Sequence, residues 1–486
     1  MTDPQPPAER ASTATAPHLS TGELRVITGL ELAGDRPVPR RQVWSWALWD
    51  WATQPFNSVI TTFVFSVYLT SALFLAPQVA GLSPDDPAYE RGLAELSSQL
   101  GLAVGLGGIL IAVLAPVLGQ RADAAGRRKF WLALATGGVV LCQAMMVFVE
   151  ADWRFFWLGA GLLAAGTVFQ EIAGVNYNAM LVQVSNARTV GRVSGLGWGF
   201  GYLGGIVVLA LVVVADFADW FGIPTDGGLN IRLVALFCAI WTVVFSLPIF
   251  LNVPEAPAAP GRERVGFFRS YVVLGRDIAR LWREARPTFW FLLASAVYRD
   301  GLAGVFTFGA VIASITFGFS FNEVVIFGVA ANVVAGVSTI VVGRLDDRFG
   351  PRAVILATLG GLIVSAVVVF VAHDAGKTVF WVFGLFLSAL VGPAQAASRS
   401  FLARVTPAGR EGEIFGLYAT TGRAASFLAP LAWAGFIAVF GAQYWGILGI
   451  ALVLAAGFVM MLFVRLPKRV ADAAHATPSS VTRSDG

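Results

Sequence analysis

The sequence is short of charge. Asp, Glu, Lys and Arg make up 13% of its 486 residues, whereas a soluble domain carries about a quarter. Hydrophobic residues make up 56%. So few charges cannot cover the surface of a soluble fold of this length, which excludes the soluble globular class. The composition predicts an integral membrane protein.

Cysteine and histidine are also scarce. Cys142 and Cys238 each lie inside an apolar stretch, which favours buried packing residues over a disulfide or a ligand pair. The histidines, His18, His373 and His475, show no metal-ligand spacing. The sequence therefore predicts no metal site.

Usable nucleotide-binding motifs are lacking as well. Gly199, Gly201 and Gly204 fit the pattern G-x-G-x-x-G, but they lie in an apolar stretch with no strand before it. No nucleophile, base and orienting residue stand out together. We expect neither a cofactor nor an enzyme, so any uphill work would draw on a solute or proton gradient.

What the chain does have is a series of apolar stretches. A helix needs about 20 apolar residues to cross the hydrocarbon core. Twelve stretches meet this length, centred near Phe63, Gly107, Gly138, Ala165, Leu209, Ile240, Phe306, Ala331, Ile363, Phe386, Phe427 and Val453. We expect an all-α integral membrane protein with twelve transmembrane helices.

Arginine and lysine are distributed unequally between the two faces. Between the spans, only Arg91, Arg154, Arg232 and Lys377 fall on one face, and most of the 34 basic residues lie near the membrane on the other. Basic residues collect on the cytoplasmic face, so we expect both termini there. The basic pI then has a topological explanation, and we expect no nucleic-acid partner.

The linker at 253–286 divides six spans from six. We expect a disordered tail at 1–40, six-helix halves at 41–252 and 287–466, and a second tail at 467–486. The Pro-, Ala- and Arg-rich linker contains a partly amphipathic basic helix.

One short motif occurs twice, in the loop after the second span of each half. The copies are GQRADAAGRR from Gly119 and GRLDDRFGPR from Gly343. A glycine permits a tight turn at a helix end, and a carboxylate there can bind an arginine or the N-terminus of another helix. Such contacts can hold helix ends together in one state and release them in another. Static loop charges that fix orientation are the alternative.

These motif copies resemble the loop signature of the major facilitator superfamily. The resemblance implies a cytoplasmic gate formed by Gly119, Asp123, Gly126, Arg127, Arg128, Gly343, Asp347, Arg348, Gly350 and Arg352. The first copy has Arg121 and Ala124 where the signature has Leu and a basic residue. It also implies the major facilitator fold, with two pseudo-symmetric halves.

Longer stretches are similar to one branch, the autophagy-related vacuolar amino-acid effluxers and their bacterial relatives. They are WALWDWATQPF at 46–56, NYNAML at 176–181, GRVSGLGWGFGYLGG at 191–205, FLLASAVYRDG at 291–301 and the segment 394–430. This branch has an aromatic residue where Asn176 stands here. The resemblance implies export of small solutes, with amino acids as leading candidates, and favours a gating role for Arg399, Arg404 and Arg410, expected in a cytoplasmic loop.

Charges inside the spans mark a candidate substrate or proton cavity. Its members are Asp50, Glu171, Asn178, Arg299, Asp300 and Arg423. Charges at membrane depth are costly, so they face a cavity or a partner rather than lipid. Arg299 and Asp300 are adjacent, about 100° apart on a helix, and each needs another partner. Buried structural ion pairs are the alternative.

Two further features are expected to be structural. Trp44, Trp46, Trp49 and Trp51 favour an interfacial belt over a substrate cage, which puts Asp50 at the edge of the interface. Gly197, Gly201 and Gly205 recur every four residues and form a smooth face for helix packing, static or moving.

The sequence thus predicts a monomeric secondary transporter of the cell membrane that exports amino acids or related metabolites by alternating access, with protons as a possible coupling ion. Asp300 or Glu171 would be the protonatable group. Efflux of another metabolite or a drug is an open alternative. A sensor or scaffold that transports nothing is a second one, and it would bind a partner through the tails or the 253–286 linker.

Overall fold

A computed structural model describes residues 28–34, 36–255 and 266–464, and these are helical throughout, with no strand among them. The first part of the chain contains α1 (Gly29–Ala33), α2 (Arg40–Pro55), the π-helix η1 (Phe56–Phe63), α3 (Phe65–Leu69), η2 (Ala72–Phe74), α4 (Pro77–Ala80), α5 (Pro87–Ala125), α6 (Arg128–Met145), η3 (Met146–Phe148), η4 (Trp153–Phe155), α7 (Phe156–Ala179), α8 (Leu181–Val184), α9 (Val190–Phe217), η5 (Asp219–Gly222), η6 (Asp226–Gly228) and α10 (Leu229–Asn252).

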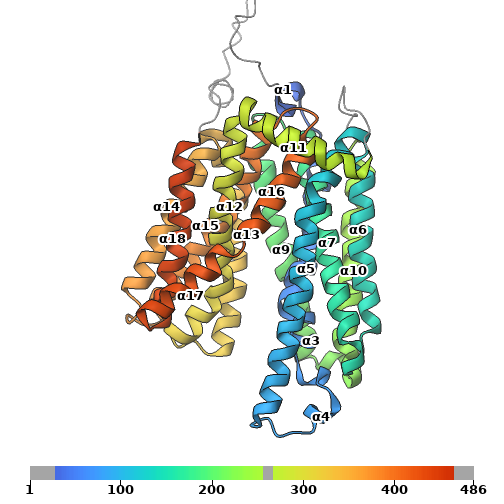
Figure 1. The fold of residues 1–486 in the computed structure, drawn as a ribbon, viewed down its shortest axis with the longest axis vertical. Coiled ribbons are helices and arrows are strands. Elements are labelled where there is room, and N and C mark those ends of the chain that lie inside the picture. The colour runs from blue at the N-terminus through green and yellow to red at the C-terminus, as the bar shows by residue number, and fades with distance from the viewer. Residues whose placement is uncertain (1–27, 35, 256–265, 465–486) are drawn as a thin grey trace, which may run out of the picture.

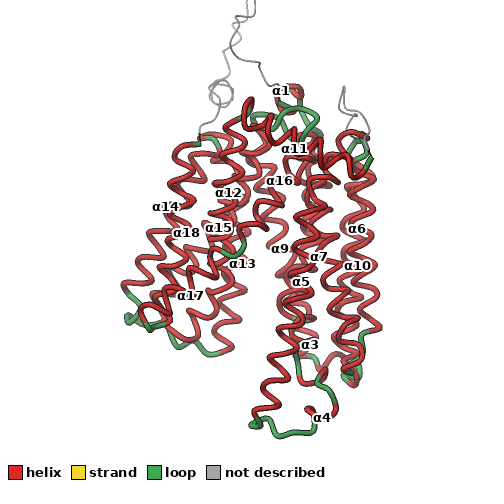
Figure 2. Tube along the Cα trace, viewed as in Figure 1, coloured by secondary structure: helices red, strands yellow, loops and turns green. Residues whose placement is uncertain are grey.

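The remaining elements belong to the second part of the chain. They are α11 (Phe267–Glu284), α12 (Arg286–Val311), the π-helix η7 (Ile312–Thr316), α13 (Phe321–Phe349), α14 (Pro351–Val371), α15 (Lys377–Val405), α16 (Glu411–Ala425), α17 (Leu428–Phe440), η8 (Gln443–Trp445) and α18 (Gly446–Phe463). Short loops join most of them (Figure 2).

Eleven helical stretches of the described chain are long and apolar enough to span a membrane. The stretch predicted as the first span is built differently, because α2, η1 and α3 follow one another from residue 40 to residue 69. Pro55 ends α2 and lacks the N–H that would continue the α-helical ladder, and the backbone passes into the wider π-helix. The prediction of an all-α membrane fold is confirmed.

The helices form two bundles, α2–α10 and α12–α18. In Figure 1 their ribbons converge at the end where α1 and α11 lie and diverge toward the end where α4 lies. Helix pairs α9–α13 and α5–α16 pack across the junction of the bundles. The converging end carries both copies of the repeated motif, and we call it the motif end.

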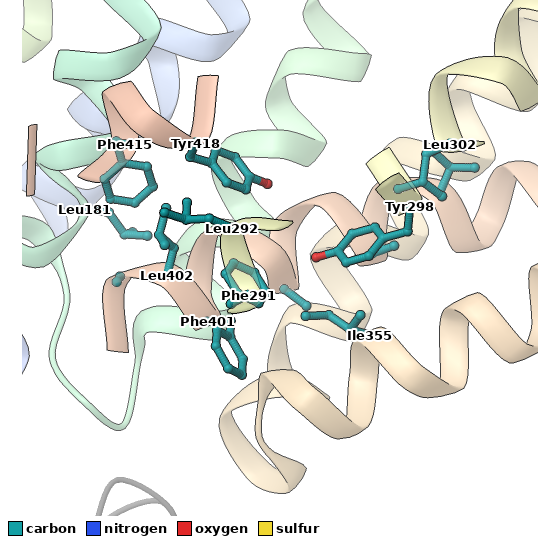
Figure 3. Close-up of a cluster of buried hydrophobic side chains, with 14 of the residues drawn as sticks. Leu181, Phe291, Leu292, Tyr298, Leu302, Ile355, Phe401, Leu402, Phe415 and Tyr418 are labelled. Atoms are coloured by element: carbon teal, nitrogen blue, oxygen red, sulfur yellow. The ribbon is translucent and has the colours of Figure 1, made fainter. Parts of the chain in front are cut away.

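A hydrophobic core joins the bundles near the motif end. Leu181 of the first bundle belongs to the same buried cluster as Phe291, Phe401 and Phe415 of the second (Figure 3). The rings of Phe291 and Phe401 stack with centroids 4.1 Å apart. A second cluster, built around Phe56, Phe65 and other apolar residues, lies within the first bundle alone.

Two segments differ from expectation near the motif end. Residues 29–33, expected within a disordered tail, form α1 because Thr28 and Glu31 make a capping box and Leu30 is buried. Arg399 and Arg404, expected in a loop, lie inside α15, which continues to Val405. Residues 1–27 and 467–486 of the expected tails lie outside the described residues.

Candidate functional site

Asp50 lies at the junction of the two bundles. The hydroxyl of Tyr177 donates to Asp50 Oδ2 at 2.9 Å, and Arg399 Nη1 lies 3.4 Å from the same oxygen. Arg399 Nη1 also donates to Asn178 Oδ1 at 2.9 Å. Asp50, Tyr177 and Asn178 belong to α2 and α7, whereas Arg399 belongs to α15, so this cluster connects the bundles.

The guanidinium of Arg399 is enclosed, with 4% of the side chain exposed. It donates to the hydroxyl and the carbonyl of Ser194, at 3.0 and 2.6 Å. Its Cζ lies 4.9, 5.5 and 5.7 Å from the ring centroids of Trp46, Tyr177 and Trp198. Hydrogen bonds and aromatic faces together offset the cost of burying this cation.

The expected tryptophan belt is wrong for two of its four members. Trp46 and Trp49 are 0% and 1% exposed, and each stacks on Tyr177 with centroids 4.4 Å apart. The indole N–H of Trp46 donates to the Tyr177 carbonyl and that of Trp49 to the Thr136 hydroxyl, both at 3.1 Å. These hydrogen bonds offset the cost of burying the two N–H groups. Asp50 therefore lies in a buried cluster and not at the interface edge.

Arg299 lies in the middle of α12 and is half-buried. Its Cζ sits 3.8 Å from the centroid of the Tyr418 ring, and its Nη1 donates to the Tyr418 carbonyl at 3.0 Å. In the described part of the chain, no carboxylate comes within ion-pair distance of this guanidinium. Several of its five N–H donors remain for other partners.

Asp300 has a different partner. Its Oδ2 accepts the backbone N–H of Ala429 at 2.5 Å, in the first turn of α17. The span predicted around Phe427 is broken there into α16 and α17, and a carboxylate suits the N-terminus that the break creates. Asp300 is 6% exposed. The two adjacent charges thus bind separate partners, as their helical spacing predicts.

Glu171 and Arg423 form an ion pair between α7 and α16. Arg423 Nη2 lies 2.5 Å from Glu171 Oε1, and about a third of each side chain is exposed. The pairing at comparable depth was one of the possibilities that the sequence offered. It connects the bundles on the side of the Asp50 cluster away from the motif end, as the positions of these residues along α7 and α16 require.

A small pocket lies one helical turn beyond Asp50. It is lined by Gln54, Ser58 and Phe63 from α2 and η1, by Tyr202 from α9 and by Asn332 from α13. Its walls therefore come from both bundles. In the described residues no group of His, Cys, Asp and Glu is arranged to hold a metal ion.

The first motif copy binds the N-terminus of α16. Asp123 accepts the backbone N–H groups of Gly412 and Glu413, both at 3.0 Å. Arg128 Nη2 lies 2.7 Å from Asp123 and 2.5 Å from Glu411. The three charged side chains are almost fully buried. One guanidinium thus forms ion pairs with two carboxylates from opposite bundles.

The second copy repeats this contact on α9. Asp347 accepts the backbone N–H groups of Gly191 and Arg192, at 2.7 and 3.0 Å. The nearby guanidinium comes from outside the motif, because Arg404 Nη2 lies 3.6 Å from Asp347 and 3.7 Å from Asp346. The two contacts, which we call the α16 lock and the α9 lock, join the bundles at the motif end.

The remaining motif residues have local roles. Gly126 and Gly350 follow α5 and α13 with φ of 60° and 83°, a backbone region that favours glycine. Arg352 donates to two backbone carbonyls at the end of α18, at 2.7 and 2.8 Å. Arg127 and Arg348 are exposed.

Glycine also sets how closely the helices approach one another at each of the two locks. A Cβ on Gly119 would meet the carbonyl oxygen of Gly412, and one on Gly343 would lie 2.9 Å from the carbonyl oxygen of Gly191. Backbone atoms cannot move aside as a flexible side chain can. Both crossings therefore require glycine.

The predicted glycine face of α9 packs mostly on its own bundle. A Cβ on Gly197 would crowd Trp46 and Tyr177 of the first bundle and Arg399 of the second. A Cβ on Gly205 would crowd Gln54 and Ser58, and Gly201 faces Asp50 at ordinary contact distance. A second face, with Gly195 and Gly199, crosses α13 of the other bundle. Gly195 and Gly199 are also four residues apart but lie outside the predicted glycine face.

Tyr177 and Glu411 were absent from the predicted site residues, whereas Arg399 and Arg404 were predicted as gating residues of a cytoplasmic loop and not as interior residues of a helix. Tyr177 lies between Asn176 and Asn178, in the stretch 176–181 that carries part of the family resemblance. The two arginines were assigned to a loop, although the apolar run before them has no helix-ending residue after Pro393. If the helix is continued through this run, the two arginine side chains fall on its interior side.

Sequence comparison gives two family matches. The family described as vacuole effluxer Atg22 like matches residues 182–474, and the Major Facilitator Superfamily matches residues 2–209. The chain is 27% identical over 428 residues to the uncharacterized MFS-type transporter YxiO of Bacillus subtilis (strain 168), covering 86% of this chain and 94% of that protein.

The chain is also similar to Autophagy-related protein 22 of Cryptococcus neoformans var. neoformans serotype D (strain B-3501A). They are 25% identical over 293 residues, which is 54% of this chain and 52% of the relative. The chain thus matches about half the length of this relative.

Among solved structures, the human organic anion transporter MFSD10 (TETRAN) has a TM-score of 0.67 at 15% identity, over 88% of this chain and 100% of that one. The proton:xylose symporter XylE, bound to 6-bromo-6-deoxy-D-glucose, has a TM-score of 0.69 at 14% identity, over 88% and 96%. These likenesses show the fold.

Proposed function

This chain belongs to the Atg22-like vacuole effluxer family and is a transporter of the Major Facilitator Superfamily, and from that premise we propose that it exports small solutes carrying a carboxylate, amino acids first among them. Transport proceeds by alternating access, in which the two bundles rock about a central site. The observation that carries the proposal is Arg299, a half-buried guanidinium at mid-span with no carboxylate partner in the described chain.

The two levels of contact between the bundles support alternating access. At the motif end the α16 lock is buried and the α9 lock is partly buried, with backbone N–H groups of one bundle bound to a carboxylate of the other. Farther along the junction, the Glu171–Arg423 pair is about a third exposed. A transporter that opens away from the motif end and closes at it has this arrangement, and rocking would reverse it.

Arg299 suits a substrate carboxylate for electrostatic reasons. An unpaired guanidinium at membrane depth is costly, and binding an anion lowers that cost. The Tyr418 ring holds the guanidinium in place on one face. Gln54, Ser58 and Asn332 line a small pocket between the bundles and offer polar groups to a small solute.

Glu171 is the better candidate for a coupling proton. Asp300 is buried and occupied by the N-terminus of α17, whereas Glu171 is accessible and binds one cation, Arg423. A proton on Glu171 would release Arg423 and weaken one contact between the bundles. The proton would thereby shift the population of the two states.

Counterflow in proteoliposomes tests the proposal. Vesicles are loaded with unlabelled amino acids, and the entry of each labelled one is followed beside protein-free vesicles. We expect saturable entry of a subset, lost in Arg299→Met by at least about tenfold, as one lost charge-assisted contact implies, and partly kept in Arg299→Lys. Arg154→Met, an exposed arginine at the opposite end, serves as the matched control and should transport normally.

One observation favours a second candidate, an organic anion without an amino group. Asp300 is bound to α17 and so is not offered to a substrate ammonium. The same vesicles loaded with simple carboxylic acids distinguish the two classes. Flux of neither class from folded, inserted protein would leave the sensor or scaffold as the better account.

We further propose the membrane location, the orientation and the division of the chain. The motif end, rich in arginine, faces the cytoplasm of a cell membrane, and both termini lie on that side. Residues 41–252 and 287–466 act as the two halves, 253–286 as the linker, and the protein works as a monomer with small solutes and protons as its ligands.

A further inference from the structure

Helix α11 runs across the motif end between the two bundles (Figure 1). One face is buried, because Ser270, Leu274 and Leu281 are 0%, 8% and 2% exposed. The hydroxyl of Tyr271 donates to the carbonyl of Val113 in α5 at 3.4 Å. The helix therefore lies against the side of α5.

The depth of α11 follows from that contact. The apolar run of α5 extends from Leu100 to Leu118 and ends before Gln120 and Arg121. Val113 lies five residues before that end, about 8 Å at 1.5 Å per residue. A helix beside Val113 is thus at the level where hydrocarbon gives way to lipid headgroups.

An exposed apolar stripe lies about 140° around α11 from its buried face. Phe268, Val272 and Trp282 are 84%, 56% and 43% exposed and follow the helical repeat. The ring of Trp282 lies 5.7 Å from that of Trp290, an exposed residue of the membrane-spanning α12. The stripe continues the lipid-facing surface of α12.

A basic stripe lies on the far side of the apolar one. By the 100° spacing of an α-helix, Arg269, Arg276 and Arg283 share one side, and all three are exposed. Apolar residues toward the acyl chains with arginines beside them at headgroup level make up an interfacial helix that attracts negative charge.

We propose that α11 is a docking surface for anionic lipid headgroups. The apolar stripe of Phe268, Val272 and Trp282 enters the acyl boundary, and Arg269, Arg276 and Arg283 bind lipid phosphates above it. Because α11 packs on both α5 and α12, a lipid bound there sits beside the junction of the two bundles.

Quenching by brominated lipid tests this with the full chain in nanodiscs. The probes are phosphatidylglycerol and phosphatidylcholine with brominated acyl chains, at equal mole fraction. The signal of Trp282 is the emission that Trp282→Phe removes. We expect phosphatidylglycerol to quench this component about twofold more than phosphatidylcholine, as surface attraction of a few arginines implies. The excess should disappear at about 1 M salt.

Replacing Arg269, Arg276 and Arg283 by Gln should abolish the excess, whereas replacing them by Lys should retain it, which separates lost charge from lost folding. Arg154→Gln, at the opposite end, is the matched control. Equal quenching by both lipids in the unaltered protein would overturn the proposal, and so would no quenching by either.

Residues 28–34 and Arg36 carry a second, independent inference. Leu30 of α1 is 2% exposed, and Thr28 pairs with Pro407, beyond α15. A Cβ on Gly29 would touch the Glu411 carboxylate, which belongs to the α16 lock. On the other bundle, Asn186 donates to the carbonyl of Arg36 at 3.3 Å.

The geometry points to a strap. Residues 28–34 and Arg36 contact both bundles at the motif end and hold the α16 lock closed, so they must detach before the bundles separate there. This inference rests on the proposed alternating access, but its test does not need transport. Leu30→Asp, which places a charge in the buried site of Leu30, should detach the strap.

Hydrogen exchange measures the result. In Leu30→Asp, peptides covering 190–196 and 411–418 should exchange several-fold faster, since local opening exposes their amides. Leu30→Met should behave as the unaltered protein. Faster exchange confined to residues 28–36, with both locks unchanged, would show that the strap is passive and overturn the inference.

Discussion

The two copies of the repeated motif share one contact and differ in another. In both, an aspartate binds two backbone N–H groups at the start of a helix in the opposite bundle. In the first copy the motif arginine, Arg128, completes the lock. Its counterpart Arg352 turns to the end of α18 instead, and Arg404 of α15 supplies the cation from a longer distance.

The difference shows which part of the motif the repeat preserves. A carboxylate at a helix N-terminus gains from both the unpaired N–H groups and the helix dipole. The arginine, in contrast, reaches the aspartate through a long, flexible side chain. An arginine from another helix can therefore supply the cation in its place. The α16 lock is thus a compact set of charges, and the α9 lock a looser one.

The largest expected effect is the loss of Arg128. Arg128→Gln leaves Asp123 and Glu411 buried without their shared cation, which should destabilise the closed motif end by about 3–5 kcal/mol. Arg352→Gln removes hydrogen bonds to backbone carbonyls near the surface and should cost about 1–2 kcal/mol. Thermal unfolding in one detergent compares them. Equal losses of stability in the two variants would contradict the difference between the two motif copies.

Arg404→Gln sharpens the comparison in the second copy. It removes the cation beside the buried Asp346 and the partly buried Asp347, and we expect a loss of about 2–3 kcal/mol, below that of Arg128 because the ion pairs are longer. Adding Asp346→Asn should recover part of the loss, since one unpaired charge is gone. A double-mutant cycle measures this recovery. Additive losses would mean that the three charges do not interact.

The glycines test the close crossings. Gly119→Ala should cost about 1–3 kcal/mol by overpacking, because its Cβ would overlap the Gly412 carbonyl. Gly343→Ala should cost less, as its Cβ would lie 2.9 Å from the nearest backbone atom. Melting temperatures report both. Gly137→Ala, where a Cβ meets open space, is the matched control.

The smallest effect is expected at the opposite end. Lys377 binds Glu323 at 2.7 Å within one bundle, and both are substantially exposed. Hydrogen bonds from Lys377 and Ser320 lower the pKa of the Glu323 carboxyl to about 2. Because this pKa is lowered in the folded state, the charged carboxylate stabilises the fold at neutral pH. That stabilisation is lost only as the pH falls through about 4 toward 2. Lys377→Gln should therefore change melting at pH 7 very little, and a large change would show that exposed pairs matter as much as buried ones.

The sequence predicted the helical fold and the repeated motif, because both rest on local patterns. It offered Glu171 and Arg423 as partners, since each stood at a comparable depth. The partner of Asp300 could not be read from it. That partner is a backbone N–H exposed by a break between α16 and α17. Pro430 is a local signal of a break in this span, but it does not indicate which side chain binds the N–H groups that the break exposes.

The burial of Trp46 and Trp49 was also beyond the sequence. Tryptophans near a span end are typical of the interface, and only tertiary contacts with Tyr177 and Thr136 decide otherwise. Arg399 was predicted to have a gating role, but its buried contacts were missed for a related reason, since its assignment to a loop rested on where α15 was expected to end. Ends of elements are the least reliable part of such a prediction.

The central claim is that the two aspartate contacts close the motif end. Electron-electron double resonance between spin labels at Arg127→Cys and Arg348→Cys, both exposed, measures the separation of the bundles there. Cys142 and Cys238 are buried and should not label. We predict one short distance in the unaltered background and an added longer one with Asp123→Asn and Asp347→Asn together. An unchanged distribution from folded protein would contradict the account.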